Sequence, residues 1–196
     1  MDKLPLVIAS GNKGKIAEFK KLLDDFPFDL MTQPVGFEIE ETGSTFMENA
    51  RIKAIAVSQV TGNLSLADDS GLSVESLGGA PGIYSSRYAN SDEKRIEKLL
   101  AELKPFQNRK AKFECALCIA SGGKALIEVS GFCEGLITLS PRGANGFGYD
   151  PIFEVSGLGE TYAEMNYEKK KHIGHRGNAF KLLMPELKKL LVSIKK

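Results

Sequence analysis

Along most of this sequence, segments whose apolar residues have the pattern of a β-strand alternate with segments whose apolar residues recur at helical spacing. The apolar run from Leu4 to Ser10 predicts a buried strand, and apolar residues then recur at helical spacing at Ile16, Phe19, Leu23 and Phe26. Because the chain keeps returning to this order of strand, turn and helix, we expect an α/β fold.

A second helix is predicted to begin just after Thr45. The segment Thr45–Glu48 has the form of a capping box, in which two side chains bind the free backbone N–H groups at a helix start. The apolar face of this helix is expected to carry Phe46, Ala50, Val57 and Val60. Lys53 falls on the same face.

Two more helices are expected later in the chain. One opens at Ser91 and is stopped by Pro105, with Ile96, Leu99, Leu100 and Leu103 as its apolar residues. The other uses the apolar residues between 179 and 194, and we expect a kink at Pro185.

The segments between these helices have the composition of strands: Leu64–Ala67, Leu72–Leu77, 112–121, 124–131 and 133–139. Asp68–Gly71, between the first two, is made of residues that favour turns. Gly122–Gly123 is a two-residue hairpin signal. The later strands therefore predict a mixed or antiparallel region of the sheet.

The composition excludes several classes of protein. The 196 residues are 42% hydrophobic and 26% charged, which suits a folded core rather than a disordered chain. The formal net charge of +1 offers no broad basic surface for a nucleic acid or an anionic membrane. The start of the chain resembles neither a membrane span nor a cleaved leader, and the three cysteines lack a metal-binding spacing. We therefore expect a cytoplasmic protein whose polyanionic ligand, if any, is small.

The first candidate site is the segment Ser10–Lys15, between the first strand and the first helix. Free N–H groups at a helix start, together with Lys13 and Lys15, favour a bound phosphate. The spacing is not that of a Walker loop. A plain polar turn before a helix explains the same residues.

The second candidate is the pair Asp68–Asp69. Successive residues of an extended segment point to opposite faces, so one carboxylate can face a ligand while the other supports the chain. Such a carboxylate can bind Mg²⁺ or accept a proton from water, and we expect Glu38, Glu40 or Glu41 to supply the further carboxylate that magnesium needs. The alternative is that Asp68–Gly71 is only a turn between strands.

Two further groups of residues could bind an anion. Lys53 lies on a face that should be buried, so it needs a carboxylate or phosphate partner, unless its head reaches water. Near the end of the chain, Phe147–Asp150 is followed by Lys169–Lys171, His175 and Arg176. An aromatic ring with cations nearby suits a nucleotide base and its phosphates, although a lysine run is also common on solvated faces.

Six segments, in this order, resemble the motifs of the inosine triphosphate pyrophosphatase family (Ham1-like non-canonical purine NTP pyrophosphatases): Ser10–Lys15, Glu40–Ala50, Ala67–Leu72, Leu77–Tyr88, Gly146–Pro151 and Gly174–Gly177. The resemblance covers nearly the whole chain, and its specificity lies in the ordered combination. It implies an elongated α/β fold, with residues 1–196 as one domain of two lobes, a central mixed sheet flanked by helices, and a nucleotide cleft between the lobes.

The resemblance also implies an activity and its partners. The family hydrolyses ITP, dITP and XTP to the nucleoside monophosphate and pyrophosphate with Mg²⁺, which removes these nucleotides from the pool. A homodimer is implied, with small purine nucleoside triphosphates as ligands and neither nucleic acid nor membrane as a partner.

Site residues follow from the resemblance position by position. Asp69 matches the proton acceptor and a metal ligand, and we take Glu40 of the Glu40–Glu41 pair as the second metal ligand. The substrate-binding positions match Ser10, Gly11, Asn12, Lys13, Gly14, Lys15, Ser70, Phe147, Gly148, Tyr149, Asp150, Lys170, His175 and Arg176. Lys170 is chosen among three adjacent lysines by counting back from Arg176.

These assignments suggest a mechanism. Asp69 or its neighbour would orient water for in-line attack at the α-phosphorus, while Lys15 and Lys53 neutralise charge on the attacked and leaving groups, which makes Lys53 a catalytic residue. Donors from His175, Arg176 or the backbone would accept the 6-keto oxygen of hypoxanthine or xanthine and would be left unpaired against adenine.

Two other functions remain open from the sequence. The chain could be a Maf-type pyrophosphatase with a different triphosphate specificity, or a nucleotide-binding regulatory protein without turnover. A panel of triphosphates assayed with and without magnesium separates these possibilities.

Overall fold

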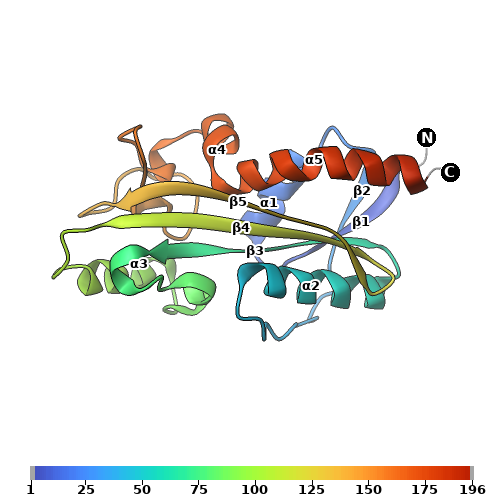
Figure 1. Ribbon diagram of the computed structural model, residues 1–196, viewed down its shortest axis with the longest axis horizontal. Coiled ribbons are helices and arrows are strands. Elements are labelled where there is room, and N and C mark those ends of the chain that lie inside the picture. Colours follow the sequence, from blue (N-terminus) through green and yellow to red (C-terminus); the bar gives the residue numbers. More distant parts are fainter. Residues whose placement is uncertain (1–2, 195–196) are drawn as a thin grey trace. The chain divides into compact units, whose positions relative to one another are not determined.

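The computed structural model describes residues 3–194, which form a mixed six-stranded sheet with flanking helices (Figure 1). The strands, in the spatial order β2-β1-β3-β4-β5-β6, are β1 (Leu4–Ala9), β2 (Phe28–Thr32), β3 (Leu64–Val74), β4 (Lys110–Ser121), β5 (Lys124–Ile137) and β6 (Phe153–Val155). The α-helices are α1 (Lys13–Leu22), α2 (Phe46–Thr61), α3 (Asp92–Glu102), α4 (Tyr167–Ile173) and α5 (His175–Ile194). Four short 3₁₀ helices are η1 (Glu75–Leu77), η2 (Gly82–Arg87), η3 (Asp150–Ile152) and η4 (Tyr162–Glu164). The expected α/β class is confirmed.

The chain divides into two compact units. Within the described residues, unit 1 comprises residues 3–69, 116–130 and 179–194, and unit 2 comprises residues 70–115 and 131–178. The boundary in β3 falls between Asp69 and Ser70, so consecutive residues of one strand belong to different units. The prediction of a nucleotide cleft between two lobes stays a prediction.

In unit 1, β1 is a central parallel strand. It pairs with β2 on one side and with β3 on the other, and Leu6 is opposite both Leu30 and Leu64. Figure 1 shows α2 on one side of these strands and α5 on the other. Coverage of both faces explains why the strand is apolar throughout and why Leu6, Val7, Ile8 and Ala9 are all buried.

Helix α2 begins as predicted. Thr45 accepts a hydrogen bond from the N–H of Glu48, whose carboxylate in turn accepts from the N–H of Thr45. Ala50, Ala54 and Val57 form its fully buried stripe. Val60, predicted to continue that face, lies in the last turn at the edge of the stripe and is 58% exposed, so that part of the prediction is wrong.

Strand β3 is longer than predicted. Leu64–Val74 is one continuous strand of eleven residues, and Asp68–Gly71 lies inside it rather than in a turn between two strands. The expectation of a break here is wrong because local turn preference is overridden by tertiary contacts: both aspartates are buried and each has a lysine partner within unit 1. Alternation along the strand gives the two carboxylates different partners.

The β4–β5 hairpin is confirmed at its turn, where Gly122 and Gly123 have φ angles of 55° and 78°. The two strands predicted at 124–131 and 133–139 are in fact one strand, β5. Its residues alternate between buried and exposed without interruption from Gly131 to Ile137, so nothing in the packing breaks the ladder.

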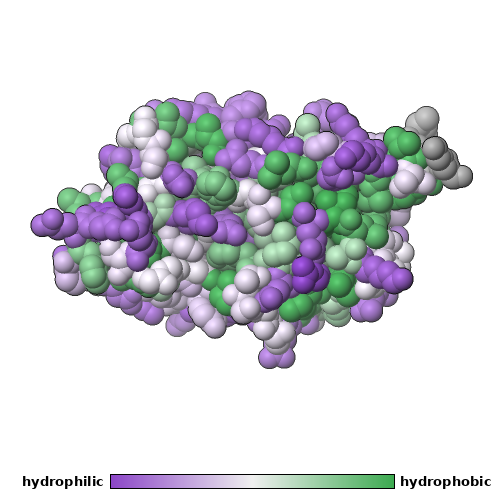
Figure 2. Space-filling view, in the orientation of Figure 1, coloured by the Kyte–Doolittle hydropathy of each residue, from purple (hydrophilic) through white to green (hydrophobic). Residues whose placement is uncertain are grey.

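The helices at the two ends of the chain differ from the predicted patterns. Helix α1 ends at Leu22, before Phe26. Helix α4 was not predicted, because this short segment has no helical apolar period. Pro185 lies inside α5. Leu183 and Leu187 are buried as expected, but Leu182 is 53% exposed. Figure 2 shows apolar side chains gathered on the visible face beneath α5, near the hairpin end of β5.

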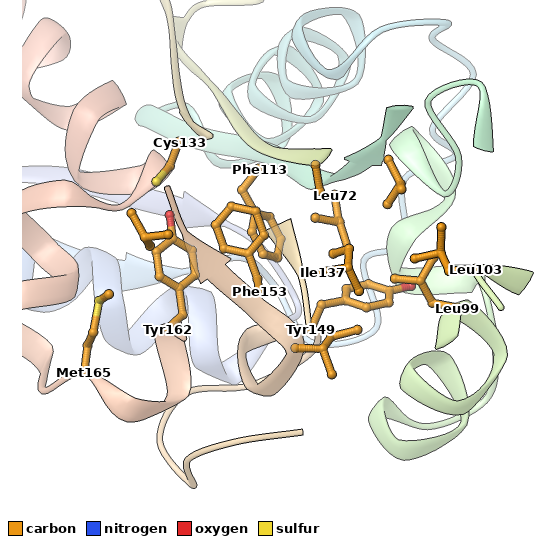
Figure 3. Packing of buried hydrophobic residues seen from close by; sticks show 14 residues of the cluster. Leu72, Leu99, Leu103, Phe113, Cys133, Ile137, Tyr149, Phe153, Tyr162 and Met165 are labelled. Atoms are coloured by element: carbon orange, nitrogen blue, oxygen red, sulfur yellow. The ribbon is translucent and has the colours of Figure 1, made fainter. Parts of the chain in front are cut away.

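Unit 2 has its own hydrophobic core. The rings of Phe113 and Phe153 meet at 4.7 Å in an edge-to-face contact, and Tyr162 packs against both (Figure 3). Leu99 and Leu103, predicted on one face of the helix after Ser91, belong to this core and are fully buried. This cluster supports the loops that carry the late motifs of the sequence.

None of the helices within residues 3–194 combines the length and the apolar character needed to cross a membrane. The three cysteines are free and buried, as a role in the core requires.

Candidate active site

The first polar cluster lies in unit 1 at the start of α1. Asn12 is the N-cap of this helix and accepts a hydrogen bond from the backbone N–H of Lys15 at 3.1 Å. The Ser10 hydroxyl accepts from the N–H of Asn12 at 3.2 Å. Lys15 points back to β3, where its Nζ lies 2.9 Å from Oδ2 of the fully buried Asp68 side chain. Local capping therefore fixes the turn, and an ion pair fixes the lysine.

A second lysine in unit 1 contacts two carboxylates. The Nζ of Lys53 lies 2.6 Å from Oε1 of Glu41 and 3.3 Å from Oδ1 of Asp69. The side chains of these three residues are only 9–19% exposed, so their charges are weakly screened by water. The anionic partner that we expected for Lys53 is thus a pair of carboxylates. The ammonium group of Lys53 contacts them and is not simply directed to solvent.

The environment changes the proton affinity of both groups. Burial raises the pKa of the Asp69 carboxyl above its usual value, by more than the positive charges of Lys53 and Lys15 lower it. Burial alone would lower the pKa of Lys53, but the nearby carboxylates of Asp69, Asp68 and Glu41 outweigh it and raise that pKa. A lysine that stays charged beside a carboxylate of increased basicity suits phosphate chemistry with Asp69 as proton acceptor.

Asn49 and Gly43 complete the surroundings of Asp69. The Asn49 side chain donates to Oδ2 of Asp69 at 3.1 Å and accepts from the N–H of Gly43 at 2.8 Å. The sequence analysis gave Asn49 no role. The available signal was a polar residue on the buried face of α2, one turn before Lys53.

The two glutamates offered by the sequence as metal ligands differ in position. Glu41 is half-buried and reaches Lys53, whereas Glu40 is exposed. Glu40 as a ligand stays a prediction, but the geometry favours Glu41 as the companion of Asp69. Residues 3–194 contain no group of three or more His, Cys, Asp or Glu side chains arranged for a metal. Mg²⁺ commonly uses one or two carboxylates plus substrate phosphates, so the convergence of Asp69 and Glu41 on one cation, Lys53, fits that metal.

The second polar cluster lies in unit 2 around Phe147. Nζ of Lys170 lies 5.3 Å from the centre of the Phe147 ring, and the Arg176 guanidinium carbon lies 5.5 Å from it. Arg176 also donates to the Ser70 hydroxyl at 2.9 Å. Two cations therefore lie beside one aromatic face, the combination expected for binding a flat ring.

Asp150 organises the loop that carries Phe147. Its Oδ2 accepts from the Phe147 N–H at 2.9 Å and pairs with Lys170 Nζ at 2.6 Å. Gly146 must be a glycine here, because a Cβ would come within 1.9 Å of the same oxygen. Tyr149 instead enters the core, where its hydroxyl donates to the Ser85 carbonyl.

His175 is held by aromatic neighbours. Its ring stacks on Phe113 at 4.7 Å, and its backbone N–H donates to the Tyr162 hydroxyl. His175 and Arg176 are almost completely buried at the start of α5. The following Gly177 allows a close approach, since a Cβ there would lie 1.7 Å from the Lys171 carbonyl oxygen.

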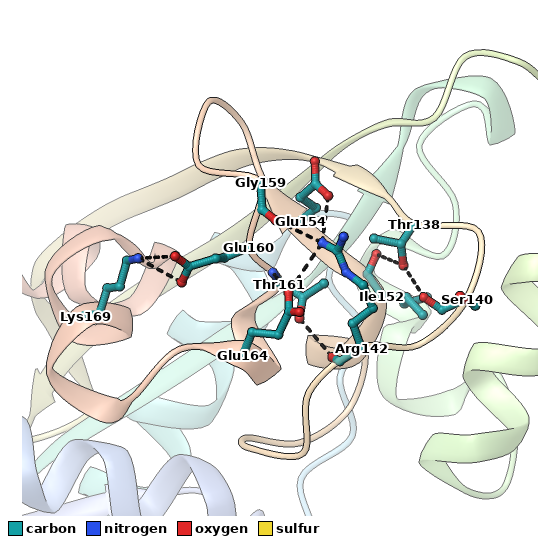
Figure 4. A network of polar contacts seen from close by, with 10 residues as sticks. All are labelled: Thr138, Ser140, Arg142, Ile152, Glu154, Gly159, Glu160, Thr161, Glu164 and Lys169. Atoms are coloured by element: carbon teal, nitrogen blue, oxygen red, sulfur yellow. Dashed lines mark hydrogen bonds and ion pairs between the residues drawn. The ribbon is translucent and has the colours of Figure 1, made fainter.

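A polar network anchors the segment before Phe147 (Figure 4). The Arg142 guanidinium pairs with Glu154 at 2.7 Å. The backbone carbonyl oxygen of Arg142 accepts a hydrogen bond from the Thr161 hydroxyl. In the same network Lys169 pairs with Glu160. The next lysine, Lys170, instead pairs with Asp150 of the Phe147 cluster. Of the adjacent lysines, Lys170 is thus the one placed in the Phe147 cluster, and Lys169 serves the network.

The predicted site residues therefore fall into two groups. Lys15, Lys53, Asp69 and Glu40 belong to unit 1, together with residues 10–14 at the start of α1, of which Lys13 is exposed. Ser70, Phe147, Gly148, Tyr149, Asp150, Lys170, His175 and Arg176 belong to unit 2. The role of each residue in substrate binding stays a prediction.

Both polar clusters lie in the part of the chain that matches a known protein family. The model of the Ham1 family matches residues 6–186, a span that contains both polar clusters. The chain belongs to the Ham1 family. Among curated Ham1 relatives, a protein from Prochlorococcus marinus (strain NATL1A) named dITP/XTP pyrophosphatase is 88% identical over 196 residues, which is 100% of both chains.

Solved structures of Ham1 proteins agree. A Ham1 protein from Staphylococcus aureus is 43% identical, with a TM-score of 0.84 and coverage of 94% of this chain and 98% of that one. A HAM1 protein from Coxiella burnetii is 42% identical, with a TM-score of 0.86 and coverage of 95% and 99%. These matches confirm the family that the six sequence motifs indicated.

Proposed function

We propose that this protein hydrolyses the non-canonical purine nucleoside triphosphates ITP, dITP and XTP to the nucleoside monophosphate and pyrophosphate. The observation that carries the proposal is the buried arrangement in unit 1 in which Lys53 contacts both Asp69 and Glu41. It offers a proton acceptor, a cation for phosphate and two metal-binding carboxylates together. The name of the relative from Prochlorococcus supports the same activity.

Unit 1 handles the triphosphate in this proposal. The backbone N–H groups at the start of α1 and the ammonium groups of Lys15 and Lys53 neutralise phosphate charge. Both lysines are paired with aspartates at distances of 2.9 and 3.3 Å. Each ammonium group has three N–H donors, so it can donate to a phosphate oxygen while it keeps its contact with the aspartate.

Asp69 is the proton acceptor. Its raised pKa brings the carboxylate closer to the proton affinity that a general base needs near neutral pH. The carboxylate orients a water molecule for in-line attack at the α-phosphorus and accepts its proton, and pyrophosphate leaves. Lys53, in contact with the same carboxylate, balances the charge that builds up on the phosphate.

Mg²⁺ is the metal that we propose for the site. Asp69 and Glu41 would hold it, with Glu40 as the alternative glutamate. When bound, the ion would neutralise part of the negative charge of the triphosphate. The support for this assignment is the chemistry of the carboxylates, which are hard oxygen ligands that converge on one positive charge.

Unit 2 selects the base. Phe147 would stack on the purine, and the donors of Arg176, His175 or the backbone would accept a 6-keto oxygen. Adenine has an amino group at that position, so a buried donor would be left unpaired, at a cost of about 1–3 kcal/mol. Ser70, which contacts Arg176, is the substrate-binding residue that we propose in β3 for this unit.

The test is a pyrophosphate-release assay with ITP, dITP, XTP, GTP and ATP, each with and without Mg²⁺. We expect magnesium-dependent release from the first three and a much lower rate with ATP. Equal rates with ATP and ITP would rule out the proposed selection of the base. No release from any triphosphate would instead favour a nucleotide-binding protein without turnover, and preference for other triphosphates would favour a Maf-type activity.

We propose a cytoplasmic location and a homodimeric state, of which the dimer rests on the family resemblance alone. The small, charged substrates belong to the cellular nucleotide pool, which supports the location. Light scattering of the purified protein tests the dimer: a molecular mass near twice 21.3 kDa is expected, and a mass near the monomer value would contradict it.

A further inference from the structure

Asn49 is a buried polar residue in unit 1 that the proposed mechanism does not use. It lies in the second turn of α2 with no exposed surface, and its backbone N–H bonds the Thr45 carbonyl in the regular helical pattern. Asparagine is a modest helix former, and burial of its amide is costly unless both ends are satisfied. Its presence at this position therefore calls for a specific partner at each end of the amide.

The two ends of the Asn49 amide contact different segments. The Gly43 backbone N–H is a donor, so the atom 2.8 Å from it must be the amide oxygen. The amide nitrogen then necessarily faces Oδ2 of Asp69, 3.1 Å away. Chemistry thus fixes the orientation of the amide, which donates to Asp69 and accepts from Gly43.

The contact with Gly43 is unusually close. A Cβ on Gly43 would lie 2.7 Å from the Asn49 amide oxygen and 2.6 Å from the Glu48 Cβ. The neighbouring N–H groups of Ser44 and Thr45 both donate to the Glu48 carboxylate. The segment that follows Glu41 is therefore tied to the first turns of α2 at several successive residues.

The contact with Asp69 separates the tasks of its two oxygens. Oδ2 is bound by Asn49, while Oδ1 faces Lys53 at 3.3 Å. Rotation of this carboxylate would break both contacts within a buried site, where an unmade hydrogen bond is expensive. Asn49 thus restricts the orientation of the group that must meet water and metal.

We propose that Asn49 is a positioning residue, which holds the Asp69 carboxylate in register with the segment that carries Glu41. The inference rests on the proposed function, because Asp69 and Glu41 are its proton acceptor and its metal-binding carboxylates. Asn49 itself touches no reacting atom in this proposal. Its effect is on how well the two carboxylates act together.

The experiment compares the wild-type protein with Asn49→Asp and Asn49→Ala in steady-state hydrolysis of dITP, over a range of Mg²⁺ concentrations. Asn49→Asp is almost isosteric and keeps an acceptor for Gly43, but it turns a donor toward Asp69 into an acceptor. For Asn49→Asp we expect kcat to fall about 10–100-fold and the half-saturating Mg²⁺ concentration to rise, with a smaller change in the KM for dITP.

Ser58→Ala is the matched control. Ser58 is also fully buried on α2, and its hydroxyl donates to the Ile55 carbonyl and accepts from the Gly123 N–H, away from Asp69. We expect this variant to lose thermal stability while kcat and the Mg²⁺ dependence stay at wild-type values. Equal kinetic losses in Ser58→Ala and Asn49→Asp at equal melting temperature would overturn the proposal, because the effect would then be structural.

Other outcomes are equally decisive. If Asn49→Asp keeps the wild-type kcat and Mg²⁺ dependence, Asn49 does not position Asp69. If neither Asn49 variant folds, Gly43→Ala decides, since it presses on the amide oxygen from the other side: the same loss of kcat supports the proposal, and wild-type kinetics overturn it. A wild-type protein that releases no pyrophosphate from dITP would count against the proposed function instead.

Discussion

The two polar clusters of this chain differ in what surrounds their positive charges. In unit 1, Lys15 and Lys53 meet buried carboxylates, at 2.6–3.3 Å. In unit 2, Lys170 also pairs with a buried carboxylate, that of Asp150 at 2.6 Å, but it and Arg176 lie in addition beside the Phe147 ring, at 5.3 and 5.5 Å. Where a lysine lies beside carboxylates, its ammonium group suits a phosphate and the carboxylates suit a metal ion. Cations beside an aromatic face suit a flat base. In the proposed function, the chemical step therefore belongs to unit 1 and the selection of the base to unit 2.

The largest effect should come from Asp69→Asn, which tests the chemical half of the comparison. The amide keeps the size of the carboxylate and one of its two acceptor oxygens, but it cannot accept a proton from water. We expect kcat for dITP to fall by at least about 10²–10⁴. The measurement is steady-state pyrophosphate release, with thermal unfolding as a control for folding. A variant with a near-normal kcat would show that another group is the proton acceptor.

The next largest effect should come from Arg176→Met in unit 2. Loss of a buried donor to the 6-keto oxygen should cost about 1–3 kcal/mol of discrimination. The ratio of kcat/KM for ITP to that for ATP should therefore fall roughly 5–150-fold. Methionine keeps an unbranched apolar stem beside Phe147 but carries no hydrogen-bond donor. Parallel assays with both triphosphates give the ratio, and an unchanged ratio would exclude Arg176 from the selection of the base.

A smaller effect is expected from Arg142→Met. This guanidinium is 39% exposed and anchors the segment before Phe147 through Glu154 and Glu164. Partly exposed ion pairs contribute about 0–1 kcal/mol, so the KM for dITP should rise by no more than about fivefold. Lys189→Met removes an ion pair of unit 1 at the surface of α5 and should leave KM unchanged. A tenfold or larger rise for Arg142→Met would mean that the network is needed for folding of the loop.

The smallest effect concerns Cys118, which lies outside both clusters. Burial disfavours the thiolate and raises the pKa of Cys118 to about 12, so the proton is retained at pH 8 and the nucleophilic form is scarce. We expect alkylation by iodoacetamide at pH 8 to leave activity unchanged and to label this thiol only after unfolding. Mass spectrometry of the native and unfolded protein checks this, and rapid labelling of the native protein would contradict it.

Much of the local structure could be predicted from the sequence where one interaction decides it. The capping box at Thr45, the Gly122–Gly123 turn and the alternation of strands and helices are set by near neighbours in the chain. The same approach failed at Asp68–Gly71, whose composition favours a turn. The ion pairs with Lys15 and Lys53 that keep it in a strand come from residues far away in the sequence.

The candidate site shows the same limit. Lys53 could be found because a lysine on an apolar helix face needs a partner. The choice of Glu41 over Glu40 beside it could not, because adjacent residues of an irregular segment carry no period to orient them. Asn49 was missed because its significance depends on Gly43 and Asp69, which meet it only in the folded chain.

The assignment of the chemical step to unit 1 and of base selection to unit 2 is tested most directly by measuring kcat/KM for ITP and ATP in Lys15→Met and in Phe147→Leu. We expect Lys15→Met to lower both values by the same factor and to keep their ratio, because a phosphate contact does not depend on the base. We expect Phe147→Leu to lower the value for ITP more and to reduce the ratio. A changed ratio in Lys15→Met together with an unchanged ratio in Phe147→Leu would contradict this assignment.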